Sequence, residues 1–486
     1  MKIRYFSCFP QMGRPLSSLC FCILACAKIS ASDLSISNEL FFTETNGATR
    51  TMYAMVHVQW KNAWRNERNH DAAWIFCKFL QDEEGFRHVR LRPNGHEVLQ
   101  IRGSAGLPLA IEVAADGNGL FLLPSGPGRG DVSVKLKLAI DVEFLSNFNP
   151  DRARFKAYGL EMVHIPEGGF WAGEPDSLAA FQYSAFFLPG DNGTHQGPLR
   201  IDSERALSVG RDLAYRSKES YYQGDGQGVL PEAFPKGYRA FYVMKYEINQ
   251  GSYADFLNAL SREQSQMRAN FGGKNYTAYR GSIRQGAEGY VADNPGRPCN
   301  FLSWDDAMAF ADWCALSPMT ELEYEKACRG GRQPVSREFP WGNADKFQIE
   351  RRVDAHGDLV HLGGKPESDL SAGTLAEFGA SYYWVFDLSG SLWERCITVG
   401  DSVGRAFVGT HGDGVLSWYG FANNKDWPKG ISETKGFGFR GGGFYRPDKG
   451  YGDFNPFSPV SYRPFGAWSG GNRSEAYGSR LVRRGP

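Results

Sequence analysis

Glycine and proline place the strongest limit on how this chain can fold. They supply 58 and 25 of its 486 residues, and both residue types favour turns over the interior of long helices. A loop-rich protein needs bulky side chains to fill its interior, and 12 Trp, 22 Tyr and 34 Phe are available. We therefore expect short strands and loops in at least two domains, because 486 residues exceed one ordinary core.

Residues 1–31 have the pattern of an export signal. Basic residues precede an apolar stretch, residues 15–27, and cleavage is predicted near Ala27 or Ala31. The apolar stretch is too short for a good transmembrane helix. Cys26 follows Ile-Leu-Ala, an imperfect lipoprotein motif, so membrane attachment through a lipidated Cys26 stays open. We predict an exported protein that is secreted, periplasmic or held at the cell surface.

Charge and cysteine content exclude several classes of protein. With 54 basic and 54 acidic residues the chain has no excess charge for nucleic acid, and no nucleic-acid partner is expected. Five cysteines follow the signal: Cys77, Cys299, Cys314, Cys328 and Cys396. Their odd number and wide spacing fit neither a dense disulfide scaffold nor a zinc motif. We expect buried free thiols, with one bridge among Cys299, Cys314 and Cys328 as the alternative.

Residues 33–155 have the pattern of a β domain. Five apolar residues alternate with other residues at 132, 134, 136, 138 and 140, residues 55–60 also alternate, and residues 73–80 are almost continuously apolar. Turn signals such as Asp-Gly-Asn-Gly at 116–119 separate these runs. The pattern predicts an immunoglobulin-like β-sandwich. The junction is placed at residues 147–154, and a second domain follows at 159–486.

Three helices are expected in the second domain. Asn249 is placed to cap the first, which has apolar residues at 253, 256, 257 and 260 on one face. Ser303 begins the second with an S-x-x-D motif. Thr320 and Glu323 form the capping box of the third. Beyond residue 329 little helical periodicity remains.

Nine short motifs follow one another in the second domain. They are MVHIPEGGF at 162–170, YEINQGSY at 246–253, LSWDDA at 302–307, MTELEYEKA at 319–327, RGG at 329–331, PWGN at 340–343, DLSGSLWE at 387–394, FRGG at 439–442 and YGSRLV at 477–482. In this order they resemble the formylglycine-generating enzyme (sulfatase-modifying factor) family. The resemblance implies an α+β fold of the C-type-lectin-like kind, with little regular secondary structure.

The whole chain is also similar to a set of secreted bacterial proteins that carry a β domain ahead of this one. The shared motif is W-x-N-x-W-R followed by D-A-A-W-x-F, which here spans residues 60–76. The runs GRAF at 404–407 and HGDG at 411–414 fit the same subgroup.

The resemblance implies an enzyme that binds copper through two cysteines shortly after the second R-G-G motif, because thiolates are the ligands that Cu(I) prefers. Residues 443–451 contain no cysteine, and none follows Cys396. The nine histidines are scattered and do not form the cluster expected of the iron site in the related sulfoxide synthases. No copper site is expected, and no catalytic residue is assigned.

The family also holds structural calcium near a G-N-x-W-E loop. The matching loop is residues 390–394, where Ser391 replaces the Asn and Glu394 remains. The resemblance makes Glu394 the candidate calcium ligand. The alternative is a buried glutamate whose oxygens accept hydrogen bonds from loop amides.

Residues 439–486 hold ten aromatic residues and eight basic against three acidic ones. By resemblance this segment lines the substrate groove, and aromatic faces with arginine forks suit sugars, peptides or anionic groups. We predict Tyr445, Tyr451, Arg463 and Trp468 to be exposed and to bind the ligand. The alternative is that most of the aromatic residues form the core and the arginines pair with Asp and Glu.

These observations favour an exported or surface-anchored protein whose family domain is a non-catalytic module for an unidentified glycan or peptide ligand. The missing copper cysteines carry this prediction. Two alternatives stay open. One is a formylglycine-generating-type oxidoreductase, or another protein-modifying enzyme, with an unconventional metal site. The other is a structural component of an extracellular assembly.

Overall fold

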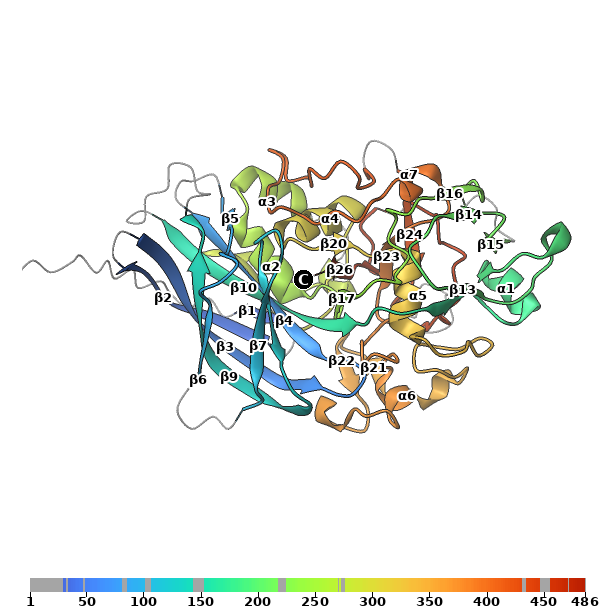
Figure 1. Cartoon of the computed structure of the whole chain (residues 1–486), viewed down its shortest axis with the longest axis horizontal. Helices are drawn as coiled ribbons and strands as arrows, with labels where there is room; N and C mark the ends of the chain where they lie inside the picture. The colour runs from blue at the N-terminus through green and yellow to red at the C-terminus, as the bar shows by residue number, and fades with distance from the viewer. Residues whose placement is uncertain are drawn as a thin grey trace, which may run out of the picture.

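The computed structural model describes residues 29–485, with gaps at 32–33, 47–48, 81–84, 101–105, 143–152, 217–223, 270, 272–275, 431–433, 446–454 and 471. The predicted signal up to residue 28 and most of the predicted junction lie outside the described residues. Within the described part of the chain no helix has the length and apolar character to cross a bilayer. The fold is mixed α+β, and Figure 1 shows long N-terminal strands at one end of the molecule.

A five-stranded antiparallel sheet is built from the N-terminal strands, in the order β1-β2-β3-β9-β6. The strands are β1 (Ile29–Ala31), β2 (Leu34–Asn46), β3 (Thr49–Arg65), β9 (Gly128–Ile140) and β6 (Glu97–Gln100). Val56 of β3 faces Leu136 of β9, and Val58 faces Val134. Residues paired in this way lie on the same face of a sheet, so the predicted alternation on β9 is confirmed as one buried face.

A second, eight-stranded sheet runs from the N-terminal segment into the rest of the chain. Its order is β20-β26-β17-β10-β4-β8-β7, with β5 paired to β4. The strands are β20 (Ser317–Pro318), β26 (Leu481–Arg484), β17 (Phe241–Met244), β10 (Arg154–Ile165), β4 (Asp71–Leu80), β8 (Leu120–Pro124), β7 (Leu109–Val113) and β5 (Arg87–Val89).

Strand β10 belongs to both parts of the molecule. Its residues from Arg154 to Val163 pair with β4, and those from Met162 to Ile165 pair with β17. The predicted division into domains at 33–155 and 159–486 therefore falls inside a single strand. The position of that division stays a prediction, and one continuous sheet crosses it.

Strand β4 faces two cores. Ile75 and Cys77 point into an apolar layer shared with β2, β3 and β9 of the first sheet. Trp74 and Phe76 point the other way, into a core that includes Trp313 at the end of a helix. Alternate residues of a strand lie on opposite faces, so a strand buried on both faces reads as a continuous apolar run. This explains why residues 73–80 lack alternation.

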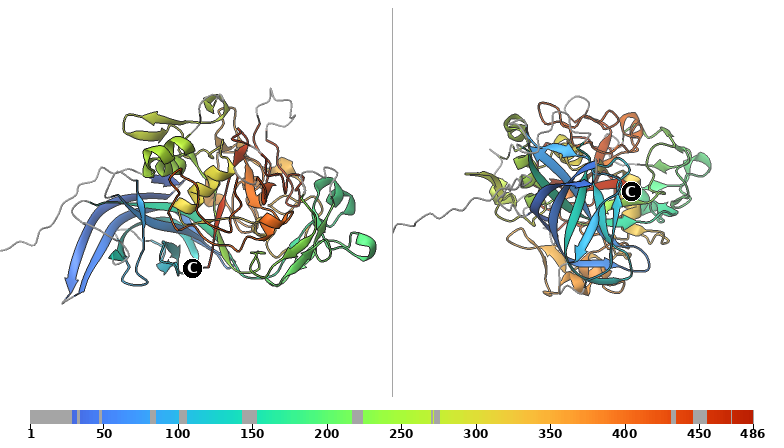
Figure 2. Two further views of the ribbon diagram at one scale, coloured as in Figure 1. Left: turned by 90° about the horizontal axis from the view of Figure 1, so that it is seen from above. Right: turned by 60° about the vertical axis from the view of Figure 1, so that its left-hand side comes forward.

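Smaller elements surround the second sheet. A three-stranded sheet has the order β24-β23-β25, which are Phe437–Arg440, Trp393–Ile397 and Tyr477–Gly478. Strand pairs are β11 (Phe170–Ala172) with β13 (Leu199–Ile201), β12 (Phe186–Phe187) with β15 (Ala214–Tyr215), β14 (Leu207–Val209) with β16 (Gly228–Leu230), β18 (Ile283–Gly286) with β19 (Gly289–Ala292), and β21 (Arg351–Val353) with β22 (Leu359–His361). Figure 2 shows the pairs from β11 to β16 at the end opposite the long N-terminal strands.

The helices are short. They are α1 (Ser177–Tyr183), α2 (Gln250–Ala259), α3 (Arg262–Arg268), α4 (Trp304–Trp313), α5 (Glu321–Arg329), α6 (Leu375–Phe378) and α7 (Ser402–Arg405), with 3₁₀ turns η2 (Asp191–Gly193), η4 (Tyr276–Tyr279), η5 (Lys346–Gln348) and η6 (Glu367–Asp369). The three predicted helices, α2, α4 and α5, are confirmed. Asn249, Ser303 and Thr320 cap them through their side chains, as expected. Helix α3 was not predicted, although Ser261 and Gln264 form its capping box.

Two histidines stack where β10 passes the start of β4. The rings of His70 and His164 have centroids 4.8 Å apart and an interplanar angle of 7°. Burial is the largest cause that lowers the pKa of His70, to about 4. Burial, followed by the neighbouring His70, lowers the pKa of His164 to about 3. With pKa values of about 4 and about 3, both rings are uncharged at pH 7, because burial disfavours the charged form.

We expect this pair to make the protein unstable in acid. The unfolded chain binds protons at both rings from about pH 6.5 downward, whereas the folded chain does not until about pH 4. The contribution of the two neutral rings to the free energy of unfolding is therefore fully present above pH 6.5. It decreases as the pH is lowered, by on the order of 2–3 kcal/mol per ring at pH 4.5. Urea unfolding of a His164→Gln variant should show a smaller loss between pH 7 and pH 4.5. A His195→Gln variant, changed outside both large sheets, should keep the wild-type pH dependence, and equal dependence in all three proteins would contradict the prediction.

Candidate functional site

The C-terminal segment, of which residues 437–445, 455–470 and 472–485 are described, packs around an aromatic cluster. Buried Trp393, Phe439 and Ala476 form its centre, and five further rings lie partly buried against them: Tyr445, Tyr462, Phe465, Trp468 and Tyr477. The ring centroid of Trp468, for example, lies 5.7 Å from that of Phe439 and 5.6 Å from that of Phe465. These aromatic residues build the interior of the segment, which was the alternative interpretation of its sequence.

The structure places the four predicted ligand-binding residues differently from one another. Tyr445 and Trp468 are half-buried on the aromatic cluster, and Tyr451 lies outside the described residues. The prediction that Arg463 is exposed is wrong, because its side chain is fully buried and ion-paired to Glu321 at 2.9 Å. Glu321 lies on α5 and is buried too, so it requires a cation from a neighbouring segment.

Two guanidinium groups share the carboxylate of Glu321. Arg440 lies 3.0 Å and Arg463 2.9 Å from its Oε2 atom, and the Thr398 hydroxyl donates to Oε1 at 2.8 Å. Burial alone would raise the pKa of Glu321, but the two arginines lower it below its ordinary value. Basic residues of the C-terminal segment thus neutralise acids of α5 in the interior.

A cavity of about 600 Å³ lies between α3, the start of α4 and the C-terminal segment. Trp304 lines it and stacks on Phe437, with ring centroids 4.2 Å apart. The polar side chains around it are Ser303, Thr434, Ser469, Gln266, Asn472, Asp305, Arg268 and Arg473, and its described lining includes neither a cysteine nor a histidine. Its volume falls in the range of small-molecule sites, about 300–1,000 Å³. This arrangement suits a polar ligand held by hydrogen bonds over an aromatic surface.

Glu394 lies on β23 at the centre of a buried group of charges. Its Oε1 atom accepts a hydrogen bond from Arg480 Nε at 2.9 Å, and Arg480 Nη2 completes the ion pair at 2.8 Å. It is Glu247, not Glu394, that accepts a loop amide, from Leu392 at 2.8 Å. Burial raises the pKa of both glutamates, and Glu394 raises that of Glu247 further. The Oε2 atoms of both have no hydrogen-bond donor among the described residues.

Further charges close this group. Asp387 accepts two hydrogen bonds from Arg351, each 3.0 Å long. Arg280 is buried, and its positive charge interacts with the carboxylate of Glu247. Its Nε atom donates a hydrogen bond to the Gly357 carbonyl at 2.8 Å. Burial lowers the pKa of Arg280 to about 10. Together with Glu394 and Arg480 this places three carboxylates and three guanidinium groups in the cluster, and Glu367 lies 3.5 Å from Arg351 at its edge.

A sequence model of the sulfatase-modifying factor enzyme 1-like domain matches residues 216–484, more than half of the chain. The chain belongs to this family. The formylglycine-generating enzyme of Thermomonospora curvata is 30% identical over 114 residues, covering 23% of this chain and 37% of that protein. The hercynine oxygenase of Mycolicibacterium smegmatis is 32% identical over 110 residues, covering 22% and 23% of the two chains. The inactive Cα-formylglycine-generating enzyme 2 of Bos taurus is 34% identical over 99 residues, covering 20% and 31%.

The chain spans about a third, or less, of the length of these curated relatives. The shared part is therefore a portion of the sulfatase-modifying factor domain, and membership of the family fixes neither the activity nor the substrate of this protein.

The cysteines do not fit the copper site that the family implies. The segment after Arg440-Gly441-Gly442 contains none. The five cysteines within the described residues are all buried and free, which confirms the expectation of buried thiols. Burial raises the pKa of each, that of Cys77 to about 12. A protonated, enclosed thiol is neither a nucleophile nor a ready metal ligand.

The sequence showed the motifs that contain Glu247, Asp387 and Arg480, but it did not show that these side chains form one buried group. Glu247 stands in the motif at 246–253 and Asp387 opens the motif at 387–394. Arg480 stands in the last motif, at 477–482. Each motif was visible, but the meeting of these three charges around Glu394 depends on loops without periodicity.

We expect Arg463→Met to lower the free energy of unfolding by about 3–5 kcal/mol, because Glu321 would stay buried with only one guanidinium beside it. Thermal and urea unfolding would measure the loss. Arg284→Met is the matched control, since Arg284 pairs with Asp293 on the surface and both side chains are more than half exposed. A variant of Arg463 as stable as the Arg284 variant would contradict the structural role.

Proposed function

We propose that this member of the sulfatase-modifying factor family is an exported, non-catalytic ligand-binding protein. The observation that carries the proposal is the cysteine-free segment after the second R-G-G motif, in a chain whose described thiols are all enclosed. Relatives are named as formylglycine-generating enzymes and hercynine oxygenases, and one is named as inactive. A fold can keep its framework while its site changes, so function follows the site rather than the family.

The ligand of this proposal occupies the cavity between α3, α4 and the C-terminal segment. Trp304 offers an apolar face there, while Asp305, Arg473 and several hydroxyl groups offer hydrogen bonds. Such a lining favours a polar molecule, a glycan or a peptide, over a lipid. Trp468, half-buried in the aromatic cluster together with Tyr445, directly precedes the lining residues Ser469 and Gly470.

The finer features of the fold belong to the same proposal. The family domain is of the C-type-lectin-like kind, and the two N-terminal sheets form an immunoglobulin-like sandwich around their common apolar layer. Export follows cleavage near Ala27 or Ala31, or anchoring at a lipidated Cys26. The mass of the N-terminal peptide of the protein recovered from culture medium and from membranes distinguishes these two routes.

We expect no formylglycine to form when the purified protein is incubated with oxygen, copper and a peptide substrate of the formylglycine-generating enzymes, with mass spectrometry as the readout. The reason is the missing thiolate pair. The enzyme of Thermomonospora curvata, run in parallel, is the positive control. Formylglycine above the level of the peptide alone, or tightly bound copper or iron that a variant of its ligands loses, would overturn the proposal.

We also propose that a Ca²⁺ ion lies beside the free Oε2 atoms of Glu247 and Glu394, since hard cations prefer carboxylate oxygens. Calcium at a hundredfold excess over its Kd would stabilise the protein by about 2.7 kcal/mol. The melting temperature should therefore rise in calcium chloride relative to EDTA, and a Glu247→Gln variant should lose that rise. Equal melting temperatures in both solutions would contradict the calcium site and would show that Arg480 and a bound proton neutralise Glu247 and Glu394.

A further inference from the structure

Two large aromatic side chains stand exposed on one turn. Trp418 is 70% and Tyr419 is 61% exposed. Val415, on the same loop, is 56% exposed. A single exposed ring needs no explanation, but adjacent rings that share one loop with further apolar surface mark a place where something binds.

The turn that carries these rings is held rigidly. The backbone N–H of Gly420 donates to the Ser417 carbonyl at 2.8 Å, and that of Ser417 donates to the Phe421 carbonyl at 2.9 Å. The Ser417 hydroxyl accepts a further hydrogen bond from the Phe421 backbone at 3.0 Å. The turn also packs on α3, because Gln264 donates to the Ser417 carbonyl at 2.9 Å. Rings presented from a fixed backbone lose little entropy when they are covered by a ligand.

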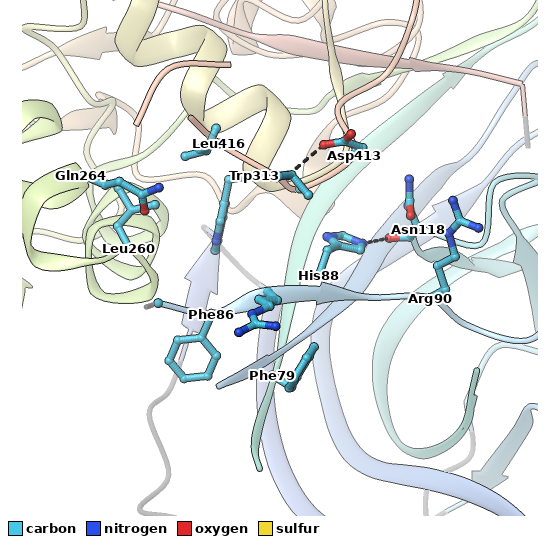
Figure 3. A pocket seen from close by; sticks show the side chains of 14 residues that line it. Phe79, Phe86, His88, Arg90, Asn118, Leu260, Gln264, Trp313, Asp413 and Leu416 are labelled. Atoms are coloured by element: carbon cyan, nitrogen blue, oxygen red, sulfur yellow. Dashed lines mark hydrogen bonds between the residues drawn. The ribbon is translucent and has the colours of Figure 1, made fainter. Parts of the chain in front are cut away.

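A cavity of about 410 Å³ adjoins the turn. Figure 3 shows that its side chains come from separate stretches: Phe86 and His88 near β5, Leu260 and Gln264 around the start of α3, Trp313 at the end of α4, and Asp413 and Leu416 on the loop before the turn. It therefore lies where the N-terminal strands meet the family domain. Gln264 both lines the cavity and donates to the turn, so the backbone of the turn adjoins the cavity wall.

The lining combines apolar walls with planar polar groups. Phe86, Leu260 and Leu416 supply the walls, and the amides of Asn118 and Gln264 and the carboxylate of Asp413 supply donors and acceptors. Arg87 and Arg90 add two guanidinium groups that donate hydrogen bonds. A pyranose ring has the same two characters, since its C–H face packs on aromatic rings and its hydroxyl groups hydrogen-bond at its edge. The volume suits one or two such rings.

We propose that Trp418, Tyr419 and the adjoining cavity form a saccharide-binding site, in which the two aromatic side chains stack on sugar rings and the cavity receives the end of the chain. This inference rests on the proposed function as a binding protein and names the class of ligand. The site is a second one, because its cavity shares no lining residue with the cavity that Trp304 lines.

The test is a titration of the full mature protein with a panel of neutral oligosaccharides, followed by calorimetry and by tryptophan fluorescence. We expect binding that weakens about tenfold or more in Kd in each of Trp418→Ala and Tyr419→Ala, because a tenfold change corresponds to one lost stacking contact of about 1.4 kcal/mol. Phe347→Ala is the matched control, since Phe347 is 79% exposed on η5 and should leave the Kd unchanged.

The outcomes separate this site from the proposed function. No binding to any oligosaccharide, or binding that survives the double variant of Trp418 and Tyr419, overturns the inference. Binding lost in Ser469→Trp, which fills the other cavity, but kept in Trp418→Ala would leave the proposed function standing and this site refuted. Formylglycine formation together with saccharide binding that depends on Trp418 would refute the non-catalytic function and leave this site standing.

Discussion

The molecule depends on the pairing of β10 with strands from both parts of the chain. β10 pairs with β4 on one side and with β17 on the other, and Lys245 follows directly after β17. Its ammonium group is buried and lies 3.0 Å from Glu161 of β10 and 3.8 Å from Asp71 of β4. A buried charge that loses its partner is strongly destabilising, so the sheet and this ion group together fix how the N-terminal strands meet the family domain.

Buried charges with partners of opposite charge also hold the C-terminal segment in place. Its excess of arginine over acid suggested a surface for ligands, yet Arg440 and Arg463 are enclosed against Glu321 and Arg480 against Glu394. In a fold with few long strands and helices, buried ion pairs and aromatic contacts connect segments that no backbone ladder joins. Local charge counts in such a protein describe its interior as much as its surface.

The features of the fold that the sequence predicted correctly are those that depend on local periodicity and helix capping. The three caps at Asn249, Ser303 and Thr320 are local, and each was correctly predicted. The alternation on β9 was correct for the same reason. Arg463 was misplaced because its partner Glu321 lies 142 residues away on a helix, and no local pattern records such a meeting. The free carboxylate oxygens of Glu247 and Glu394 were missed for the same reason, since two motifs far apart in the sequence supply them.

The HGDG motif at 411–414 shows how the N-terminal strands and the family domain act together on one loop. Asp312, at the end of α4, accepts the backbone N–H groups of Asp413 and Gly414 at 2.9 and 3.1 Å. Lys78 of β4 reaches the Gly414 carbonyl from the other side, at 3.5 Å. A side chain at Gly412 would lie within 2.3 Å of the Asp312 backbone, so only glycine allows this approach. The loop that carries Trp418 is thus fixed by a carboxylate of α4, an ammonium group of β4 and a close glycine contact. A surface positioned in this way does not depend on any cysteine side chain, because none of the groups that hold the loop is a thiol.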